Sequence, residues 1–161
     1  MIKQKLSVVL PCFNEEENIK RISAELLPIL RNLEEDFEII AVDDGSTDNS
    51  EKEILKIKEP RIKLIKHPKN LGLGFALRTG VNKAEGDLLI TLDADFTYSP
   101  KFIPLLLENM EKRPDIDFII GSPVLGGHGR DINFLRVIVS KIANKIYSFL
   151  LGRKATAITS I

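Results

Sequence analysis

The chain has 161 residues, which is enough for one domain with a full hydrophobic core and too few for two. Its apolar fraction of 43% and charged fraction of 29% are ordinary for a soluble globular protein. The single cysteine, Cys12, excludes an internal disulfide framework and fits a reducing compartment. The N-terminus lacks a signal-peptide pattern, and no run of about 18 apolar residues predicts a membrane-spanning helix.

Charge is unevenly distributed along the chain, although the formal net charge is zero. Residues 1–60 hold 8 basic side chains against 14 acidic ones, whereas residues 128–161 hold 6 against 1. The basic segment at 128–161 is therefore a candidate surface for an anionic partner.

Apolar runs and apolar residues at helical spacing predict strands that alternate with helices. In chain order, the expected elements are strand 6–10, helix 16–33, strand 37–42, helix 49–58, strand 62–66, helix 74–84, strand 88–92, helix 100–112, strand 117–121 and helix 132–151. Asn14 is the expected cap of the first helix, and Pro28 is expected to kink it. This alternation predicts a three-layer α/β fold with a mostly parallel sheet, in a single domain over 1–161.

The unusual residues of the sequence gather where the expected strands end. In open parallel sheets, ligands bind beyond the carboxyl ends of the strands. Polar and glycine-rich loops follow four of the expected strands, at 11–15, 43–48, 70–74 and 93–95. These loops are therefore expected to converge on one binding crevice.

Asp93 and Asp95 follow the expected strand 88–92. Because side chains alternate along an extended backbone, both carboxylates can face the same side, roughly 6–7 Å apart. Such a pair suits Mg²⁺ or Mn²⁺ shared with a diphosphate, since these ions take one or two carboxylates plus phosphate oxygens and water. The other interpretation is a solvated turn, and the position after a buried strand favours the metal.

Two further loops have more than one interpretation. Asp43 is expected to cap loop amides, while Asp44 is either an acceptor for a base or ribose or a second capping residue. The glycines of 70–74 either allow close approach of a ligand to the backbone or make a tight turn. This segment lacks the Lys-Ser/Thr ending of a nucleoside triphosphatase loop.

The expected helix 132–151 has a polar stripe that includes Arg136, Ser140 and Asn144 and is widened by Lys141 and Lys145. This pattern is typical of an ordinary surface helix, and it equally fits a basic amphipathic helix on an anionic membrane. The basic charge of the surrounding segment favours the membrane.

Four motifs in the loops carry a family resemblance: Pro11-Cys12-Phe13-Asn14-Glu15-Glu16, Asp43-Asp44-Gly45-Ser46-Thr47-Asp48, Asn70-Leu71-Gly72-Leu73-Gly74 and Asp93-Ala94-Asp95. Taken together, they resemble family-2 glycosyltransferases with the GT-A fold. The resemblance is strongest to dolichol-phosphate mannosyltransferases and undecaprenyl-phosphate sugar transferases. The order and spacing of the motifs cover nearly the whole chain.

The resemblance implies an inverting hexosyltransferase that moves a sugar from a nucleotide diphosphate sugar, of the GDP-mannose or UDP-glucose type, to a polyprenyl or dolichyl phosphate. The implied nucleotide-sugar-binding residues are Pro11, Asn14, Glu15, Asp44, Gly72 and Asp93. Asp93 and Asp95 would hold Mg²⁺ or Mn²⁺, and Asp95 and Arg136 would be the catalytic residues. Ser122, Arg136 and Ser140 would bind the acceptor phosphate.

The implied partners are a nucleotide-diphosphate sugar, a polyprenyl-phosphate lipid and a membrane surface, with no nucleic acid. The implied location is cytoplasmic, peripheral on the cytoplasmic face of the membrane. Relatives carry Arg where Pro123 stands and continue beyond Ile161, so a C-terminally truncated member is expected, better suited to binding donor than acceptor. A glycosyltransferase with a hydroxyl acceptor and a non-catalytic nucleotide-sugar-binding fragment are the alternatives.

Overall fold

The computed structural model describes residues 4–121 and contains a parallel sheet in the order β3-β2-β1-β4. The strands are β1 (Lys5–Cys12), β2 (Asp36–Asp43), β3 (Ile62–Lys66) and β4 (Leu88–Thr91). β1 and β2 are central and pair from Lys5 with Asp36 to Cys12 with Asp43. Each lies between two other strands, and their continuous apolar runs are buried, as a sheet covered on both faces requires.

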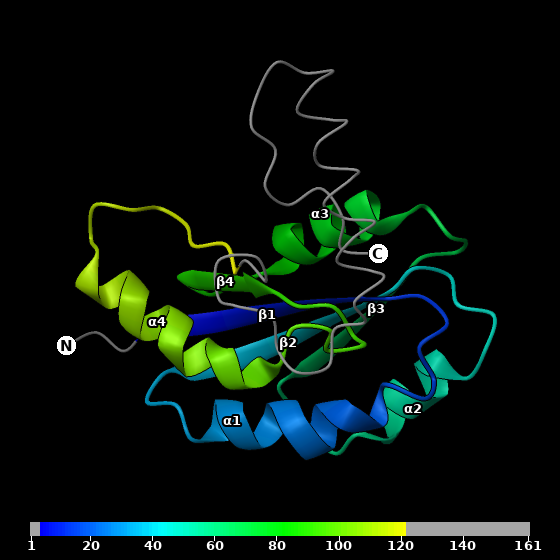
Figure 1. Ribbon diagram of the computed structural model, residues 1–161. Coiled ribbons are helices and arrows are strands. Elements are labelled where there is room, and N and C mark those ends of the chain that lie inside the picture. The colour runs from blue at the N-terminus through cyan, green and yellow to red at the C-terminus, as the bar shows by residue number, and fades with distance from the viewer. Residues whose placement is uncertain (1–3, 122–161) are drawn as a thin grey trace, which may run out of the picture. The chain divides into compact units, whose positions relative to one another are not determined.

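Helices cover both faces of this sheet. They are α1 (Leu27–Arg31), α2 (Ser50–Lys56), α3 (Leu73–Lys83) and α4 (Ile103–Lys112), with a 3-10 turn, η2 (Pro100–Phe102), before α4. Helix α3 lies on one face, while α1, α2 and α4 lie on the other (Figure 1). The expected three-layer α/β fold with a parallel sheet is therefore confirmed.

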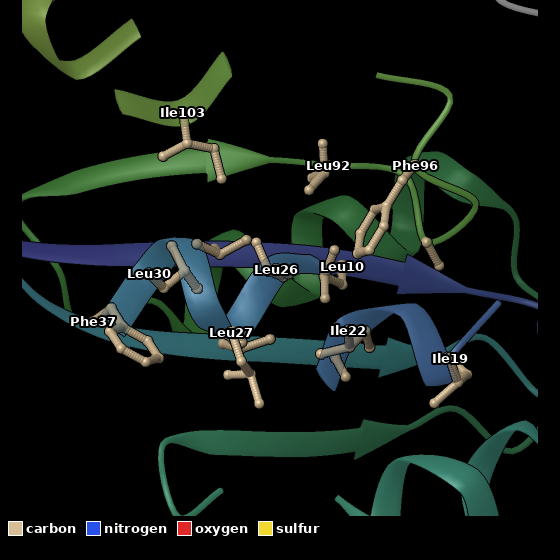
Figure 2. Close-up of a cluster of buried hydrophobic side chains, with 14 of the residues drawn as sticks. Leu10, Ile19, Ile22, Leu26, Leu27, Leu30, Phe37, Leu92, Phe96 and Ile103 are labelled. Carbon is tan, nitrogen blue, oxygen red and sulfur yellow. The ribbon is translucent and has the colours of Figure 1, made fainter. Parts of the chain in front are cut away.

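The hydrophobic core has two parts, one on each face of the sheet. The larger part joins β1 and β2 to the segment around α1 and to α4, and Figure 2 shows its side chains meeting between these elements. The smaller part contains Val9, Ile40 and Val42 of the sheet together with Ala76 of α3. Successive residues of β1 and β2 thus contribute to opposite cores, which fixes the register of the two central strands.

The first helix differs from the expected continuous helix 16–33. Turns over 16–19 lead into a π-helical segment, η1 (Ile22–Leu26), and α1 follows it. The N–H of Leu27 donates to the carbonyl of Ile22, one residue further back than in an α-helix. Pro28 follows immediately and has no N–H for an α-helical bond. The change from π-helix to α-helix thus falls just before Pro28, and the kink expected at this residue stays a prediction.

The expected strand 117–121 is wrong. Residues 113–121 contain a turn and a bend but no strand, and Phe118 and Ile120 are 74% and 75% exposed. A strand exists only where a neighbouring strand accepts its backbone hydrogen bonds, and this segment forms no such ladder. An apolar run alone therefore overpredicted sheet structure here.

Residues up to Lys112 belong to one compact unit, and Arg113 begins a second. Only 113–121 of the second unit are described, so the single domain expected over 1–161 stays a prediction. The expected helix 132–151 lies outside the described residues. No helix within residues 4–121 is long and apolar enough to cross a membrane.

Candidate functional site

The loops after β1 and β2 are joined at the carboxyl edge of the sheet. The backbone N–H of Asn14 donates to Ser46 Oγ at 3.0 Å, and the N–H of Glu15 donates to Ser50 Oγ at 2.7 Å. Asn14 Oδ1 in turn accepts the backbone N–H of Thr47 at 2.8 Å. Backbone amides that point away from the sheet are thus satisfied by side chains of the neighbouring loop, which holds the two loops at one spacing.

The role expected for Asn14 as a helix cap is wrong. Its backbone has a φ of +56°, and its side-chain oxygen is used by Thr47 of the other loop. Asn tolerates this left-handed conformation better than most residues, so it can turn the chain sharply here. The first turn after it is instead closed by the carbonyl of Glu15, which accepts the N–H groups of Asn18 and Ile19.

Pro11 and Glu15 lie on either side of this turn, and both are partly buried. Pro11 is the last but one residue of β1, beyond the final β1–β4 pair of Val9 with Thr91. The Glu15 carboxylate accepts a hydrogen bond from Asn18 Nδ2 at 2.7 Å. Both residues thus belong to the edge on which the expected site lies.

Asp43 has the structural role expected of it. It is fully buried at the end of β2, and its Oδ1 accepts the backbone N–H of Ser46 at 2.8 Å. This bond turns the chain directly after the strand and brings the hydroxyl and amide groups of 46–50 toward the loop after β1.

The Asp44 carboxylate binds the loop that precedes α3. It is 3% exposed, and it accepts the N–H of Leu71 at 3.0 Å, the N–H of Gly72 at 2.8 Å and a bond from His67 Nδ1 at 2.6 Å. Burial raises the pKa of Asp44, but these hydrogen bonds outweigh it and the pKa lies below its usual value. Asp44 is therefore an anion that brings Gly72, another expected site residue, against the end of β2.

Glycine is needed at two points of this arrangement. Gly45 has a φ of +73°, and a Cβ there would lie 2.3 Å from the carbonyl carbon of Lys69. Gly72 has a φ of +93° at the start of α3, with open space around its Cα. Gly45 therefore allows close backbone approach between two loops, whereas Gly72 supplies only a backbone conformation that other residues avoid.

Asp93 and Asp95 project from the segment after β4. Leu92, Ala94 and Phe96 are buried, and the two aspartates between them are exposed. Exposure therefore alternates along 92–96 as expected, but the backbone is not the expected extended segment. Residues 94 and 95 form a turn, in which the N–H of Phe96 donates to the carbonyl of Asp93 at 3.0 Å and Phe96 has a φ of +49°. Burial and the neighbouring charge of Asp95 raise the pKa of Asp93 above its usual value. Like charge is thus concentrated at this point of the chain.

Asp95 is held in position by its neighbours. Its two oxygens accept the backbone N–H and the hydroxyl of Thr97, each at 2.8 Å. The guanidinium of Arg21 donates to the backbone carbonyl of Asp95 and lies 5.2 Å from the centre of the Phe96 ring. Arg21 thereby ties the segment before η1 to the loop after β4. The sequence pattern did not single out this residue, because its contact spans 74 positions.

The donor set at Asp93 and Asp95 fits a divalent cation that completes its coordination elsewhere. No group of three or more Asp, Glu, His or Cys side chains that could hold a metal occurs within 4–121. Two carboxylates alone leave most positions of an Mg²⁺ or Mn²⁺ ion to other oxygens. The pair is therefore suited to an ion that arrives with phosphate oxygens and keeps some water.

The described site residues come from the loops at the carboxyl ends of all four strands. The strand order places the loop after β1 between the loops after β2 and β4, with β3 outermost. Direct contacts join Asp44 to Gly72 and Asn14 to Thr47. Ser122, Arg136 and Ser140, the residues expected to bind the acceptor phosphate, lie outside the described residues.

A parallel sheet with acidic and glycine-rich loops at its carboxyl edge is an α/β domain of the class that binds ligands beyond the ends of its strands. The sequence model described as "Glycosyl transferase family 2" matches residues 7–159. The chain belongs to this glycosyltransferase family. The expectation drawn from the four loop motifs is confirmed.

Two curated relatives show where the chain stands within the family. It is 36% identical over 152 residues to the undecaprenyl-phosphate 4-deoxy-4-formamido-L-arabinose transferase of Proteus mirabilis, covering 92% of this chain and 45% of the relative. It is 36% identical over 140 residues to the dolichol-phosphate mannosyltransferase of Pyrococcus furiosus, covering 85% of this chain and 38% of the relative. The chain thus spans less than half the length of these relatives.

Solved structures share the fold. The mannosyltransferase PcManGT from Pyrobaculum calidifontis, in complex with GDP-Man and Mn2+, aligns with a TM-score of 0.59 at 19% identity, over 68% of this chain and 33% of that one. The M. tuberculosis glucosyl-3-phosphoglycerate synthase, in complex with Mn2+ and UDP, aligns with a TM-score of 0.54 at 28% identity, over 66% of this chain and 39% of that one.

Proposed function

We propose that this chain is the donor-binding part of an inverting glycosyltransferase that moves a hexose from a nucleotide diphosphate sugar to a polyprenyl phosphate. The observation that carries the proposal is the exposed, like-charged pair Asp93 and Asp95 at the carboxyl edge of the sheet. The two curated relatives support the acceptor class, because their names specify undecaprenyl phosphate and dolichol phosphate.

Asp93 and Asp95 are the residues that would hold Mg²⁺ or Mn²⁺. Their carboxylates are exposed, and Asp95 is already oriented by Thr97. A bound divalent cation would supply positive charge opposite the diphosphate, which gains charge as its bond to the sugar breaks. Solved structures of similar fold contain Mn2+ beside GDP-Man or UDP, which supports a cation of this kind.

The nucleoside would lie against the loops after β1 and β2. Pro11, Asn14 and Glu15 would form one wall, and Asp44 with Gly72 would form the other. Asp44 contributes mainly by holding the 71–72 amides in place, because three of about four acceptor positions on its carboxylate are used by the protein. One acceptor position, on Oδ2, is left for a donor group of the base or ribose.

A polyprenyl phosphate acceptor is already anionic at neutral pH, so attack on the sugar needs no general base. A hydroxyl acceptor would need one to take its proton. The acceptor phosphate would be held by Ser122, Arg136 and Ser140, with Arg136 completing the catalytic set together with Asp95. A basic helix at 132–151 would place the protein peripherally on the cytoplasmic face of an anionic membrane.

The proposal is tested by donor binding first. Isothermal titration of the chain with UDP and with GDP, each with and without Mn²⁺, should show at least one nucleotide that binds more tightly when the metal is present. A nucleotide that binds equally with and without Mn²⁺ would contradict the role of Asp93 and Asp95. No binding of either nucleotide would overturn the proposed function.

Acceptor chemistry is tested by transfer of radiolabelled sugar from the bound donor type. Label that moves into organic-extractable lipid when polyprenyl phosphate is supplied supports the proposal. Label that moves only to a water-soluble glycan or protein would identify a hydroxyl acceptor instead. Sedimentation with vesicles that contain anionic lipid, at low and high salt, separately tests the membrane location. Salt screens the attraction between basic side chains and anionic lipid, so binding should fall as the salt concentration rises.

A further inference from the structure

A buried histidine adjoins the candidate nucleoside site, although no catalytic step requires it. His67 directly follows β3 and is 8% exposed. Its backbone N–H donates to the carbonyl of Asp43 at 2.8 Å, which continues the pairing of β2 and β3 by one residue. The sheet thus fixes the backbone of His67 directly before the loop that leads to α3.

Both ring nitrogens of His67 have partners on other elements. Nδ1 lies 2.6 Å from Asp44 Oδ1, and Nε2 lies 2.9 Å from Thr79 Oγ1 in α3. The ring therefore links the end of β2, the end of β3 and the second turn of α3. These three elements also frame the 71–72 amides that Asp44 binds.

The two partners of the imidazole determine which ring nitrogen of His67 carries the proton. Asp44 is an ionised carboxylate that can only accept, so Nδ1 of His67 carries the proton. In a neutral ring, Nε2 is then an acceptor, and the hydroxyl of Thr79 donates to it. The two contacts together select one tautomer and one orientation of the imidazole.

The same contacts determine which part of Asp44 stays available. Among residues 4–121, Oδ1 accepts from both His67 and Leu71, whereas Oδ2 accepts only from Gly72. Without the bond from His67, the carboxylate could rotate and exchange the roles of its oxygens. With it, the single unused acceptor position lies on Oδ2.

We infer that His67 is a positioning residue for donor recognition, which orients the Asp44 carboxylate so that Oδ2 is the oxygen offered to the nucleoside, with Thr79 orienting the ring. This inference rests on the proposed function, since it assigns Asp44 to the nucleoside. It extends that function to two residues, His67 and Thr79, that do not themselves contact the ligand.

Two near-isosteric substitutions separate positioning from space filling. The side-chain nitrogen of Asn is bonded to Cγ, like Nδ1 of histidine, so His67→Asn keeps a donor for Asp44. The nitrogen of Gln lies one atom further out, near the place of Nε2, so His67→Gln can reach Thr79 but leaves Asp44 Oδ1 without that donor. A residue that merely fills space would tolerate Gln, which is closer to histidine in size, at least as well as Asn.

The experiment measures the dissociation constants of UDP and GDP without metal, together with hydrogen exchange of the Leu71 and Gly72 amides. His67→Gln should raise the dissociation constant of the nucleotide that the parent chain binds by about tenfold or more, and His67→Asn should raise it by less than about threefold. Thr79→Val should raise this dissociation constant by a few-fold, while Thr79→Ser should match the parent. In His67→Gln, both amides should exchange faster than in His67→Asn.

Equal affinities for the Asn and Gln variants of His67, at temperatures where circular dichroism shows both folded, would overturn the inference. If the parent chain binds neither UDP nor GDP, the proposed function fails. Hydrogen exchange then tests the link between His67 and Asp44 independently of nucleotide binding. Equal exchange of the Leu71 and Gly72 amides in the two variants would overturn that link as well.

Discussion

Asn14 and Thr47 form a two-point contact across loops that are 33 residues apart in the chain. Asn14 Oδ1 accepts the backbone N–H of Thr47 at 2.8 Å and its hydroxyl at 3.2 Å. Asn14 adopts a positive φ to make this contact. This side chain thereby adds to the bonds from the Asn14 and Glu15 amides that hold together two loops that would receive a nucleoside.

Replacing Asn14 by Ala should lower the free energy of unfolding by about 1–2 kcal/mol, because the bonds to Thr47 are lost and Ala is strained at positive φ. Asn14→Gly is the matched control, since it loses the same bonds without the strain. Urea denaturation should therefore rank the Gly variant above the Ala variant. The reverse order would show that the positive φ carries no strain here.

Asp95→Asn should remove the part of nucleotide binding that depends on Mn²⁺, by roughly tenfold or more in affinity, while binding without metal stays unchanged. Asn keeps an oxygen for the N–H of Thr97, so the circular dichroism spectrum should match that of the parent. Asp87→Asn removes an equal charge just before β4, at the opposite edge of the sheet, and should change neither titration. A parent-like Mn²⁺ response in the Asp95 variant would exclude it as a ligand.

Asp44→Ala should affect stability and binding together. It leaves His67 and the amides of Leu71 and Gly72 without their acceptor, which should cost about 1–3 kcal/mol in unfolding free energy. It should also weaken metal-free binding of a nucleoside monophosphate by roughly tenfold. Lower stability with unchanged affinity, measured well below the melting temperature, would assign Asp44 to a capping role alone.

The strands and the acidic loops could be predicted because their signals are local. A buried parallel strand such as β2 is a continuous apolar run, and the edge strand β3 was expected with the bounds that the structure shows, Ile62–Lys66. The exposure of Asp93 and Asp95 between buried neighbours is likewise a property of one short segment, although the structure shows a turn there and not the expected extended backbone.

The partners of the loop residues could not be predicted, because they depend on which loops the sheet places side by side. Asn14 has a capping composition, yet its partner is Thr47 of another loop. No sequence pattern singles out His67. Its position directly after β3 is the signal that could reveal it, because ligands bind beyond the carboxyl ends of parallel strands. A lone histidine after a strand has no pattern that names Asp44 and Thr79 as its partners.

Near the amino edge of the sheet lies another buried carboxylate, Glu38, whose role is structural. Its Oε1 accepts the hydroxyl of Ser7 at 2.7 Å and the N–H of Glu85 at 2.8 Å, and Lys63 Nζ lies 2.9 Å from Oε2. Burial raises the pKa of Glu38, but the bonds from Lys63, Ser7 and the Glu85 amide outweigh it and lower the pKa from 4.5 to about 2.

The lowered pKa predicts acid sensitivity. A carboxyl whose pKa is lower in the folded state stabilises the fold above its unfolded pKa of 4.5, and this contribution is lost as pH falls toward about 2. Glu38→Gln should therefore lower stability at neutral pH by on the order of 1–3 kcal/mol and flatten its decline over that acid range. Nucleotide affinity should not change, because Glu38 lies at the opposite edge. An unaltered pH profile of the melting temperature would contradict this role.

Gly45 and Gly72 provide a test of why glycine is required at each position. Both have positive φ, so Ala at either should cost about 1–2 kcal/mol from backbone strain. Only at Gly45 would the new Cβ also meet backbone atoms, at 2.3 Å from Lys69 C and 2.6 Å from Asn70 N. Backbone cannot move aside as a side chain can, so this clash should add a further cost.

Gly45→Ala should consequently be much more destabilising than Gly72→Ala, with a loss above about 3 kcal/mol in urea denaturation or no folded protein at all. Its clash forces apart the loop after β2 and the segment 69–70, so nucleotide affinity should fall in any folded fraction. Gly72→Ala should remain folded. Equal stability of the two variants would mean that the 45 and 69–70 backbones separate readily, and that their close approach does not hold the site together.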